Sequence, residues 1–176
     1  MKVIIRKETE NDYKTVELLI EEAFKNEENS DHMEHVLVSK LREGENFING
    51  LSLVAEREGE VVGHILLTKA KIENESDKYE TLALAPVSVL PKYQGIGIGS
   101  ELIKEGMRIG RELGYDSIVV LGHDKYYPRF GFKKASLWGI KAPFDVPDEN
   151  YMAIELNEES LKNISGVVRY ANEFLE

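Results

Sequence analysis

The sequence contains no cysteine. That absence excludes disulfides, thiolate metal sites and a cysteine nucleophile, and it is compatible with a reducing cytoplasm. Basic residues are in the minority, with 22 Lys and Arg against 32 Asp and Glu, which gives a formal net charge of −10. This balance argues against binding to nucleic acids or anionic membranes and mildly favours cationic partners.

Long apolar runs are missing as well. The N-terminal segment 1–7 has a short apolar core that ends in charges, and no run approaches the length that spans a membrane. We expect a soluble, cytoplasmic protein without a metal site. No linker, repeat or low-complexity tract interrupts the 176 residues, so we expect a single domain over residues 1–176. The sequence favours neither a monomer nor a homodimer.

Apolar periodicity predicts an α/β chain in which strands and helices are mixed. We expect strands at residues 2–7, 51–57, 61–72, 82–90, 117–121, 151–156 and 166–170, and helices after residues 9–12, over 31–41, over 100–113 and, briefly, over 158–163. Residues 125–130 are a short helical or looped piece. Residues 138–150 form an irregular excursion of the kind that commonly closes a substrate pocket.

The stretch Val87–Gly99 joins an apolar strand to the helix at 100–113 through glycines at positions 95, 97 and 99. A strand, a glycine turn and a helix in this order bring free backbone N–H groups and the positive end of a helix dipole to one point. A phosphate group is the natural occupant of such a point. A glycine-rich turn without a ligand is the alternative interpretation.

Two common phosphate-binding motifs do not fit these glycines. No Lys-Ser or Lys-Thr pair follows them, as a P-loop requires, and the sixth position counted from Gly95 is Ser100, where the dinucleotide-binding fingerprint has glycine. The spacing that fits is Gln-x-x-Gly-x-Gly, at Gln94, Gly97 and Gly99. It resembles the acetyl-CoA pyrophosphate loop of the GCN5-related N-acetyltransferases (GNAT).

Pro86 lies inside the strand predicted at 82–90. Proline removes a hydrogen bond from a β-ladder, so it is confined to edge strands and bulges. Because the run around it is almost continuously apolar, as in a strand buried on both faces, we favour a bulge over an edge strand. A bulge would separate this strand from its neighbour, as the resemblance implies for the fourth strand of the family, which receives the pantetheine arm.

A second landmark lies at Tyr127, Gly131 and Phe132, which match the pattern Tyr-x-x-x-Gly-Phe. In the family that tyrosine lies beside the coenzyme sulfur. Residues 122–132 as a whole are similar to the YhbS-like branch of predicted acetyltransferases. The resemblance covers nearly the whole chain, and it implies a mixed central sheet with a bulged, splayed fourth strand and helices on both faces.

The resemblance also implies an N-acetyltransferase that moves the acetyl group of acetyl-CoA to an amine by direct attack. Tyr127 would be the general acid that protonates the departing thiolate. Coenzyme contacts are expected from Val87, Ser88, Val89, Gln94, Gly95, Ile96, Gly97, Ile98, Gly99 and Ser100, with backbone N–H groups near Ser88 and Val89 polarising the thioester carbonyl. His123, Asp124, Glu80 and an ordered water are the alternatives for the general base.

Other functions stay open at this point. A non-catalytic acyl-CoA sensor or interaction module would need the glycine turn but not the acid at Tyr127. A nucleotide-binding α/β protein is disfavoured, because both phosphate-binding motifs fail. The acceptor is not defined by the sequence, although the acidic balance suits a polyamine, an aminoglycoside or a basic peptide terminus. His64, inside a predicted strand, is expected to have a structural role.

Overall fold

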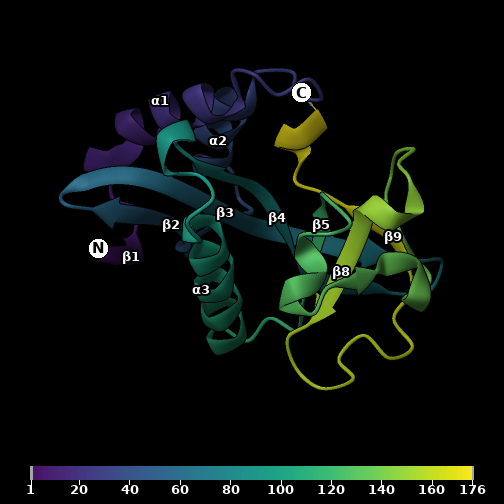
Figure 1. The fold of residues 1–176 in the computed structure, drawn as a ribbon. Coiled ribbons are helices and arrows are strands. Elements are labelled where there is room, and N and C mark those ends of the chain that lie inside the picture. The colour runs from purple at the N-terminus through teal and green to yellow at the C-terminus, as the bar shows by residue number, and fades with distance from the viewer. Residues whose placement is uncertain (1, 176) are drawn as a thin grey trace.

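A mixed nine-stranded β-sheet runs through the computed structural model, which describes residues 2–175 (Figure 1). The strands are β1 (Val3–Lys7), β2 (Phe47–Arg57), β3 (Glu60–Glu73), β4 (Lys78–Val89), β5 (Ser117–Leu121), β6 (Lys133–Lys134), β7 (Ile140–Lys141), β8 (Tyr151–Glu155) and β9 (Gly166–Arg169). The α-helices are α1 (Tyr13–Phe24), α2 (Glu34–Arg42) and α3 (Ile98–Glu112). The strand order is β1-β2-β3-β4-β5-β8-β6, and β9 pairs with β3 and β7.

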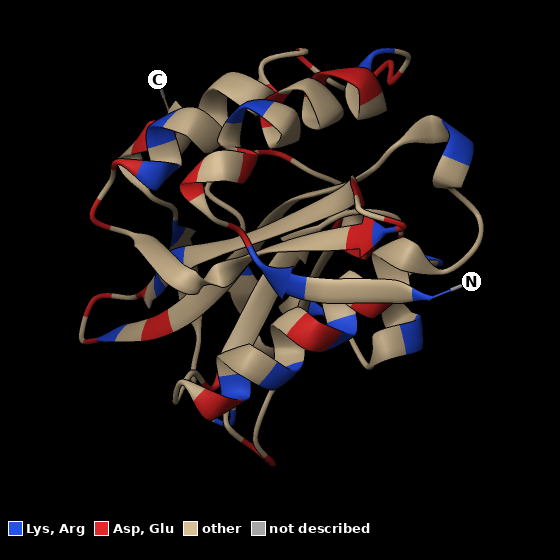
Figure 2. Cartoon of the chain, turned by 90° about the vertical axis from the view of Figure 1, so that its left-hand side faces the viewer, with Lys and Arg blue, Asp and Glu red and all other residues tan. Residues whose placement is uncertain are grey.

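Helices cover both faces of the sheet, as predicted. In Figure 1, α1 and α2 lie above the strands and α3 lies below them. Side chains of one strand alternate between these layers, so Ile65 of β3 packs in the cluster with Leu102 of α3, whereas Leu66 packs in the cluster with Ile20 of α1. Figure 2 shows Lys and Arg scattered among Asp and Glu along the elements. No helix within residues 2–175 is long and apolar enough to cross a membrane.

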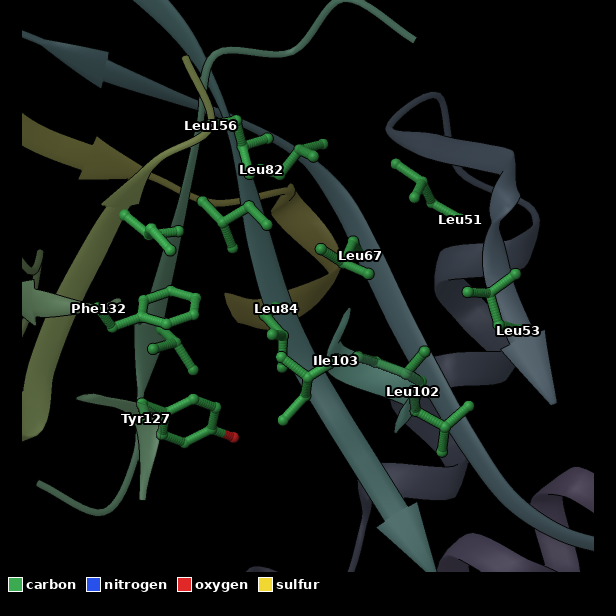
Figure 3. Packing of buried hydrophobic residues seen from close by; sticks show 14 of the residues in the cluster. Leu51, Leu53, Leu67, Leu82, Leu84, Leu102, Ile103, Tyr127, Phe132 and Leu156 are labelled. Carbon is green, nitrogen blue, oxygen red and sulfur yellow. The ribbon is translucent and has the colours of Figure 1, made fainter. Parts of the chain in front are cut away.

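The helix α3 lies close to the sheet because its inward face carries glycine. A Cβ atom added to Gly106 would lie 2.9 Å from Cδ1 of Leu67, and one added to Gly110 would lie 3.1 Å from Cδ1 of Leu82. Both leucines belong to the core between α3 and the sheet (Figure 3). The two interior glycines, which weaken a helix, are therefore explained by the close approach of helix and sheet.

The strand β4 contains the predicted bulge. Ile65 pairs with Val87 and Leu67 pairs with Leu84, so β4 uses one residue more than β3 over the same length. The extra residue falls at the Ala85–Pro86 bond, which is cis. Because β4 lies between β3 and β5, the edge-strand alternative is wrong.

β4 and β5 run parallel, as the crossover through α3 predicts. In the described part of the chain they pair only at Leu82 with Ile118 and at Ala83 with Val119. Beyond Ala83, β4 stays with β3 and β5 stays with β8. The two strands therefore separate toward the end of β4, which confirms the splayed fourth strand.

Some predicted elements differ from the structure. The helix expected at 158–163 is wrong, because this segment forms turns in which Glu159 and Asn163 have φ angles of 55° and 64°. A right-handed helix cannot continue through such residues. The predicted helix at 31–41 starts later, at Glu34, and β6 and β7 were missed because each has two residues.

Candidate active site

The chain enters α3 through a turn that requires glycine. Gly95 and Gly97 have φ angles of +81° and +94°, which L-residues with a side chain rarely adopt. A Cβ atom at either position would meet no atom within 4 Å. The glycines are therefore demanded by the backbone, and the space beside them is open to a ligand.

The turn presents free hydrogen-bond donors. None of the backbone N–H groups of residues 95–100 donates to a backbone carbonyl within residues 2–175, and the first bond of the helix runs from Glu101 N to the Gly97 carbonyl, at 3.0 Å. Gln94 fixes the turn to the end of β4, because its Nε2 donates to the Val89 carbonyl at 3.0 Å. Free N–H groups at the start of a helix are suited to bind an anion such as a pyrophosphate.

A cavity of about 620 Å³ opens in front of this turn. It is lined by Val87, Val89, Tyr93, Gln94, Gly95, Gly97, Ile98, Gly99, Ser100, His123, Tyr126 and Arg129. All of the predicted coenzyme-contacting residues belong to this lining except Ser88 and Ile96. Ile96 is 61% exposed, and Ser88 lines a different cavity. We call this space the α3 cavity.

Three residues of the α3 cavity were not predicted from the sequence: Tyr93, Tyr126 and Arg129. The Tyr126 hydroxyl lies 3.2 Å from Ser100 Oγ at the start of α3. The Arg129 guanidinium lies 5.0 Å from the centre of the Tyr126 ring and brings a positive charge to the cavity. Both Tyr126 and Arg129 lie within residues 122–132, but Tyr126 precedes the pattern Tyr-x-x-x-Gly-Phe and Arg129 occupies one of its unspecified positions.

Tyr127 lines neither the α3 cavity nor the cavity at the end of α1, and belongs to the core between α3 and the sheet. It is buried, and its ring packs edge-on against Tyr126 and Phe132 with centroid distances of 5.2 Å and 5.6 Å. In Figure 3 its hydroxyl points away from Phe132, toward the side on which Ile103 lies. Burial raises the pKa of Tyr127 well above the ordinary value of a tyrosine, so the hydroxyl keeps its proton.

A second cavity, of about 370 Å³, lies on the other face of the sheet at the end of α1, and we call it the α1 cavity. It is lined by Glu22, Ala23, Phe24, Asn26, Glu27, Val87, Ser88, Val89, Pro91 and Gln94. Val87, Val89 and Gln94 line both cavities, so the two spaces meet at the end of β4. Glu22 and Glu27 give the α1 cavity a negative lining that holds no Lys or Arg.

Free backbone donors lie at this meeting point. Leu90 N donates to the Val62 carbonyl at 2.9 Å, and the backbone groups of an antiparallel strand alternate in direction. The N–H groups of Val87 and Val89 therefore point away from β3, to the side that β5 has left, whereas the N–H group of Ser88 points toward β3. Of the expected carbonyl-polarising groups, Val89 is available and Ser88 is not.

The other predicted residues are dispersed. His123 lines the α3 cavity, whereas Asp124 and Glu80 line neither cavity. Glu80 pairs with Lys71, in the half of β4 remote from Val89. Residues 138–150, expected to close a substrate pocket, line neither of these two cavities. Their Phe144 stacks on Tyr170 instead, at a centroid distance of 6.0 Å.

Comparisons with known proteins agree with this geometry. The profile of the Acetyltransferase (GNAT) family matches residues 14–132. The chain is 44% identical to the uncharacterized N-acetyltransferase YjhQ of Escherichia coli strain K12 over 115 residues, which are 65% of the chain and 64% of YjhQ. It is 29% identical to the uncharacterized N-acetyltransferase YhbS of the same strain over 173 residues, 98% of each protein.

Solved structures extend the similarity to the whole fold. The crystal structure of YhbS from Escherichia coli in complex with CoA has a TM-score of 0.89 and 27% identity, and covers 100% of the chain and 93% of YhbS. A GNAT family acetyltransferase from Brucella melitensis in complex with acetyl-CoA has a TM-score of 0.81 and 34% identity, over 98% of both chains. The chain belongs to the GNAT acetyltransferase family, whose members are acetyl-CoA-dependent acyltransferases.

Proposed function

We propose that this protein is an N-acetyltransferase that moves the acetyl group of acetyl-CoA to an amine, with residues 1–176 acting as a single domain. The observation that carries the proposal is the meeting of the two cavities at Val87, Val89 and Gln94. One cavity offers free N–H groups to a pyrophosphate, and the other offers carboxylates to a cationic amine. A coenzyme and an acceptor entering from opposite faces would react where β4 and β5 have separated.

The residues of the α3 cavity suit acetyl-CoA. The N–H groups of residues 95–100 and the Arg129 guanidinium would hold its phosphates. The pantetheine arm would run along the end of β4, where the Val89 N–H can donate to the thioester carbonyl. That hydrogen bond strengthens as negative charge develops on the oxygen during attack, so it favours the transition state over bound acetyl-CoA.

In the proposed reaction the amine nitrogen attacks the thioester carbon. A C–N bond forms and the C–S bond breaks. The nitrogen gives up a proton to water or to His123, the candidate base that lines the α3 cavity, and the departing thiolate takes one. We assign the donor of that second proton to Tyr127. Support comes from its match to Tyr-x-x-x-Gly-Phe and from a hydroxyl that has no hydrogen-bond partner within residues 2–175. The Tyr126 hydroxyl, by contrast, already has a hydrogen-bond partner in Ser100 Oγ, beside the proposed phosphate site.

The acceptor class follows from charge. Glu22 and Glu27 line the α1 cavity and the whole chain has a net charge of −10, so a cationic acceptor is attracted to this face. Polyamines, aminoglycosides and basic peptide N-termini share that chemistry. Each carries a second positive charge that a carboxylate at the mouth of the cavity can bind while one amine reaches β4.

Two measurements test the proposal. Millimolar CoA should raise the melting temperature, because a ligand that binds only the folded state stabilises it. Thiol release from acetyl-CoA, measured with a panel of spermidine, putrescine, kanamycin and a lysine-rich peptide, should exceed the rate without amine. A folded protein whose melting temperature does not respond to CoA would contradict the coenzyme assignment.

The second candidate is a non-catalytic acyl-CoA-binding module. Such a module needs the α3 cavity alone, whereas a second cavity that meets it at β4 favours an enzyme. Stabilisation by CoA without thiol release in the presence of any amine of the panel would favour the module.

A further inference from the structure

A buried chain of polar side chains lies between the sheet and the helices α1 and α2. Ser52 Oγ lies 2.7 Å from Oε1 of Glu8, and His64 Nε2 lies 3.0 Å from Ser52 Oγ. Arg42 Nη2 donates to Oε2 of Glu8 at 2.7 Å. His64 is 0% exposed and Ser52 is 1% exposed. Polar groups buried this deeply are expensive unless each has a partner.

In this chain of hydrogen bonds, the donor and the acceptor of each bond are fixed by Glu8. The carboxylate of Glu8, paired with Arg42, can only accept hydrogen bonds, so Ser52 must donate its single proton to Glu8. Ser52 then accepts from His64, which places the imidazole proton on Nε2 and leaves Nδ1 as a bare acceptor. Burial, followed by the charge of Arg42, lowers the pKa of His64 to about 3, so the imidazole is neutral.

Ser88, which is also buried, lies next to this chain on the neighbouring strand β4. His64 of β3 and Ser88 of β4 are directly opposite each other, so their side chains share the α1 face of the sheet. Neither His64 Nδ1 nor Ser88 Oγ has a hydrogen-bond partner, although both atoms are buried. Ser88 also lines the α1 cavity, where Glu22 and Glu27 lie.

We propose that Ser88 binds the attacking nitrogen of the acceptor and that His64 is the residue that positions Ser88. After a change of the Ser88 rotamer, the Ser88 hydroxyl donates a hydrogen bond to His64 Nδ1, so its oxygen turns its lone pairs toward the α1 cavity and accepts from an N–H group of the amine. The nitrogen keeps its own lone pair free for attack on the thioester. Because Glu8 fixes the direction of every hydrogen bond in the chain, Ser88 is left as an acceptor, and it selects a ligand that donates an N–H group. This inference rests on the proposed acetyl transfer.

The first test needs no activity. Nitrogen-15 NMR of the imidazole, with the His64 signals assigned through His64→Phe, should show the Nε2–H form of a neutral ring from about pH 5 to 8. Ser88→Ala should shift the Nδ1 resonance. Thr68→Val is the matched control, because Thr68 of β3 also has a buried, unpartnered hydroxyl but lines neither cavity. An Nδ1–H form, an imidazolium at neutral pH or an Nδ1 signal indifferent to Ser88→Ala would overturn the inference.

The second test uses the amine of the panel with the fastest thiol release. Ser88→Ala should lower kcat/KM for that amine by about 10–100-fold, the value of one hydrogen bond to a strongly polar group, while KM for acetyl-CoA stays within about twofold. His64→Phe should have a similar effect, and the double variant should lose little more, because both changes remove the same contact. Thr68→Val should retain the kinetics of the parent.

The outcomes separate this inference from the proposed function. An active parent whose amine kinetics are unaffected by Ser88→Ala would overturn the role of Ser88 and leave acetyl transfer intact. A parent that acetylates no amine of the panel would refute the proposed function and, with it, the role of Ser88, whatever the NMR spectrum shows.

Discussion

Tyr126 and Tyr127 are neighbours in the chain, but their hydroxyl groups have different surroundings. Tyr126 lines the α3 cavity and contacts Ser100, whereas Tyr127 is buried and its hydroxyl has no hydrogen-bond partner in the part of the chain that the structure describes. Burial of Tyr127 is tight, because a Cβ atom added to Gly122 would lie 2.2 Å from Cε2 of its ring. At the scale of single residues, the roles of the two hydroxyl groups can therefore be distinguished by replacing each tyrosine with phenylalanine in turn.

We expect Tyr127→Phe to lower kcat by about 10²–10⁴-fold with coenzyme affinity almost unchanged, because general acid catalysis contributes about that much. Tyr126→Phe should instead weaken coenzyme binding, by no more than about tenfold, since it removes one neutral hydrogen bond beside the phosphate site. Steady-state kinetics and calorimetric titration with CoA measure both effects. A Tyr127→Phe enzyme with near-normal kcat would remove Tyr127 from the mechanism.

His64 makes a prediction about pH. Its pKa in the folded protein, about 3, lies below the ordinary value of 6.5, so below pH 6.5 the unfolded chain binds a proton that the folded chain does not. The charged neighbours of the ring are Glu8 and Arg42. The contribution of His64 to the free energy of unfolding is therefore fully present above about pH 6.5. It falls by up to about 1.4 kcal/mol per pH unit as the pH drops toward 3.

Urea unfolding between about pH 5.5 and 4 measures this slope. The slope should be shallower in His64→Phe than in the parent by about 1.4 kcal/mol per pH unit. Thr68→Val should keep the parent slope, since it removes no titratable group. Equal slopes in the parent and in His64→Phe would show that the folded protein binds the proton at His64 after all.

At the scale of elements, glycine in the turn before α3 has two proposed roles: it allows a positive φ, and it leaves space for the phosphates of the coenzyme. Gly59, in the turn between β2 and β3, provides the matched case, because it has a φ of +81° and no atom within 4 Å of an added Cβ. Gly97 has a φ of +94° and the same open surroundings, but it lines the α3 cavity. The two positions share a left-handed backbone and open surroundings, and only Gly97 lines the α3 cavity.

Gly59→Ala and Gly97→Ala should each lower the free energy of unfolding by about 1–2 kcal/mol, the cost of a side chain in the left-handed region. Only Gly97→Ala should also reduce the affinity for CoA, by at least about tenfold, because its methyl group enters the space of the phosphates. Denaturation and calorimetry measure the two effects. Equal CoA affinities of the two variants would mean that Gly97 serves the turn alone.

The sequence predicted those features that depend on neighbouring residues. The glycine turn, α3, the bulge at Pro86 and the parallel crossover each follow from local spacing, and the structure has all of them. The α1 cavity was not predicted, because it joins the end of α1 to the end of β4, and no local pattern links these segments. The bond between Ser52 and Glu8 spans 44 positions and was missed for the same reason.

At the scale of the whole molecule, the two cavities lie on opposite faces of the sheet and meet at Val87, Val89 and Gln94. Acetyl-CoA and amine would then be bound at the same time, and no cysteine is present to carry the acetyl group between them. Initial rates measured against both substrates should give intersecting double-reciprocal lines. Parallel lines would indicate an acetylated intermediate of the enzyme and contradict direct attack.

The separation of β4 from β5 also has an evolutionary consequence. Only Val87, Val89 and Gln94 line both cavities, so in the proposed reaction most residues of the acceptor side can change without touching the coenzyme side. Substitutions around Glu22 and Glu27 would change which amine is chosen without altering the grip on acetyl-CoA. On the proposed function, a lineage that keeps the glycine turn could thus acquire a new substrate through a few changes at the end of α1 and in the residues that follow it.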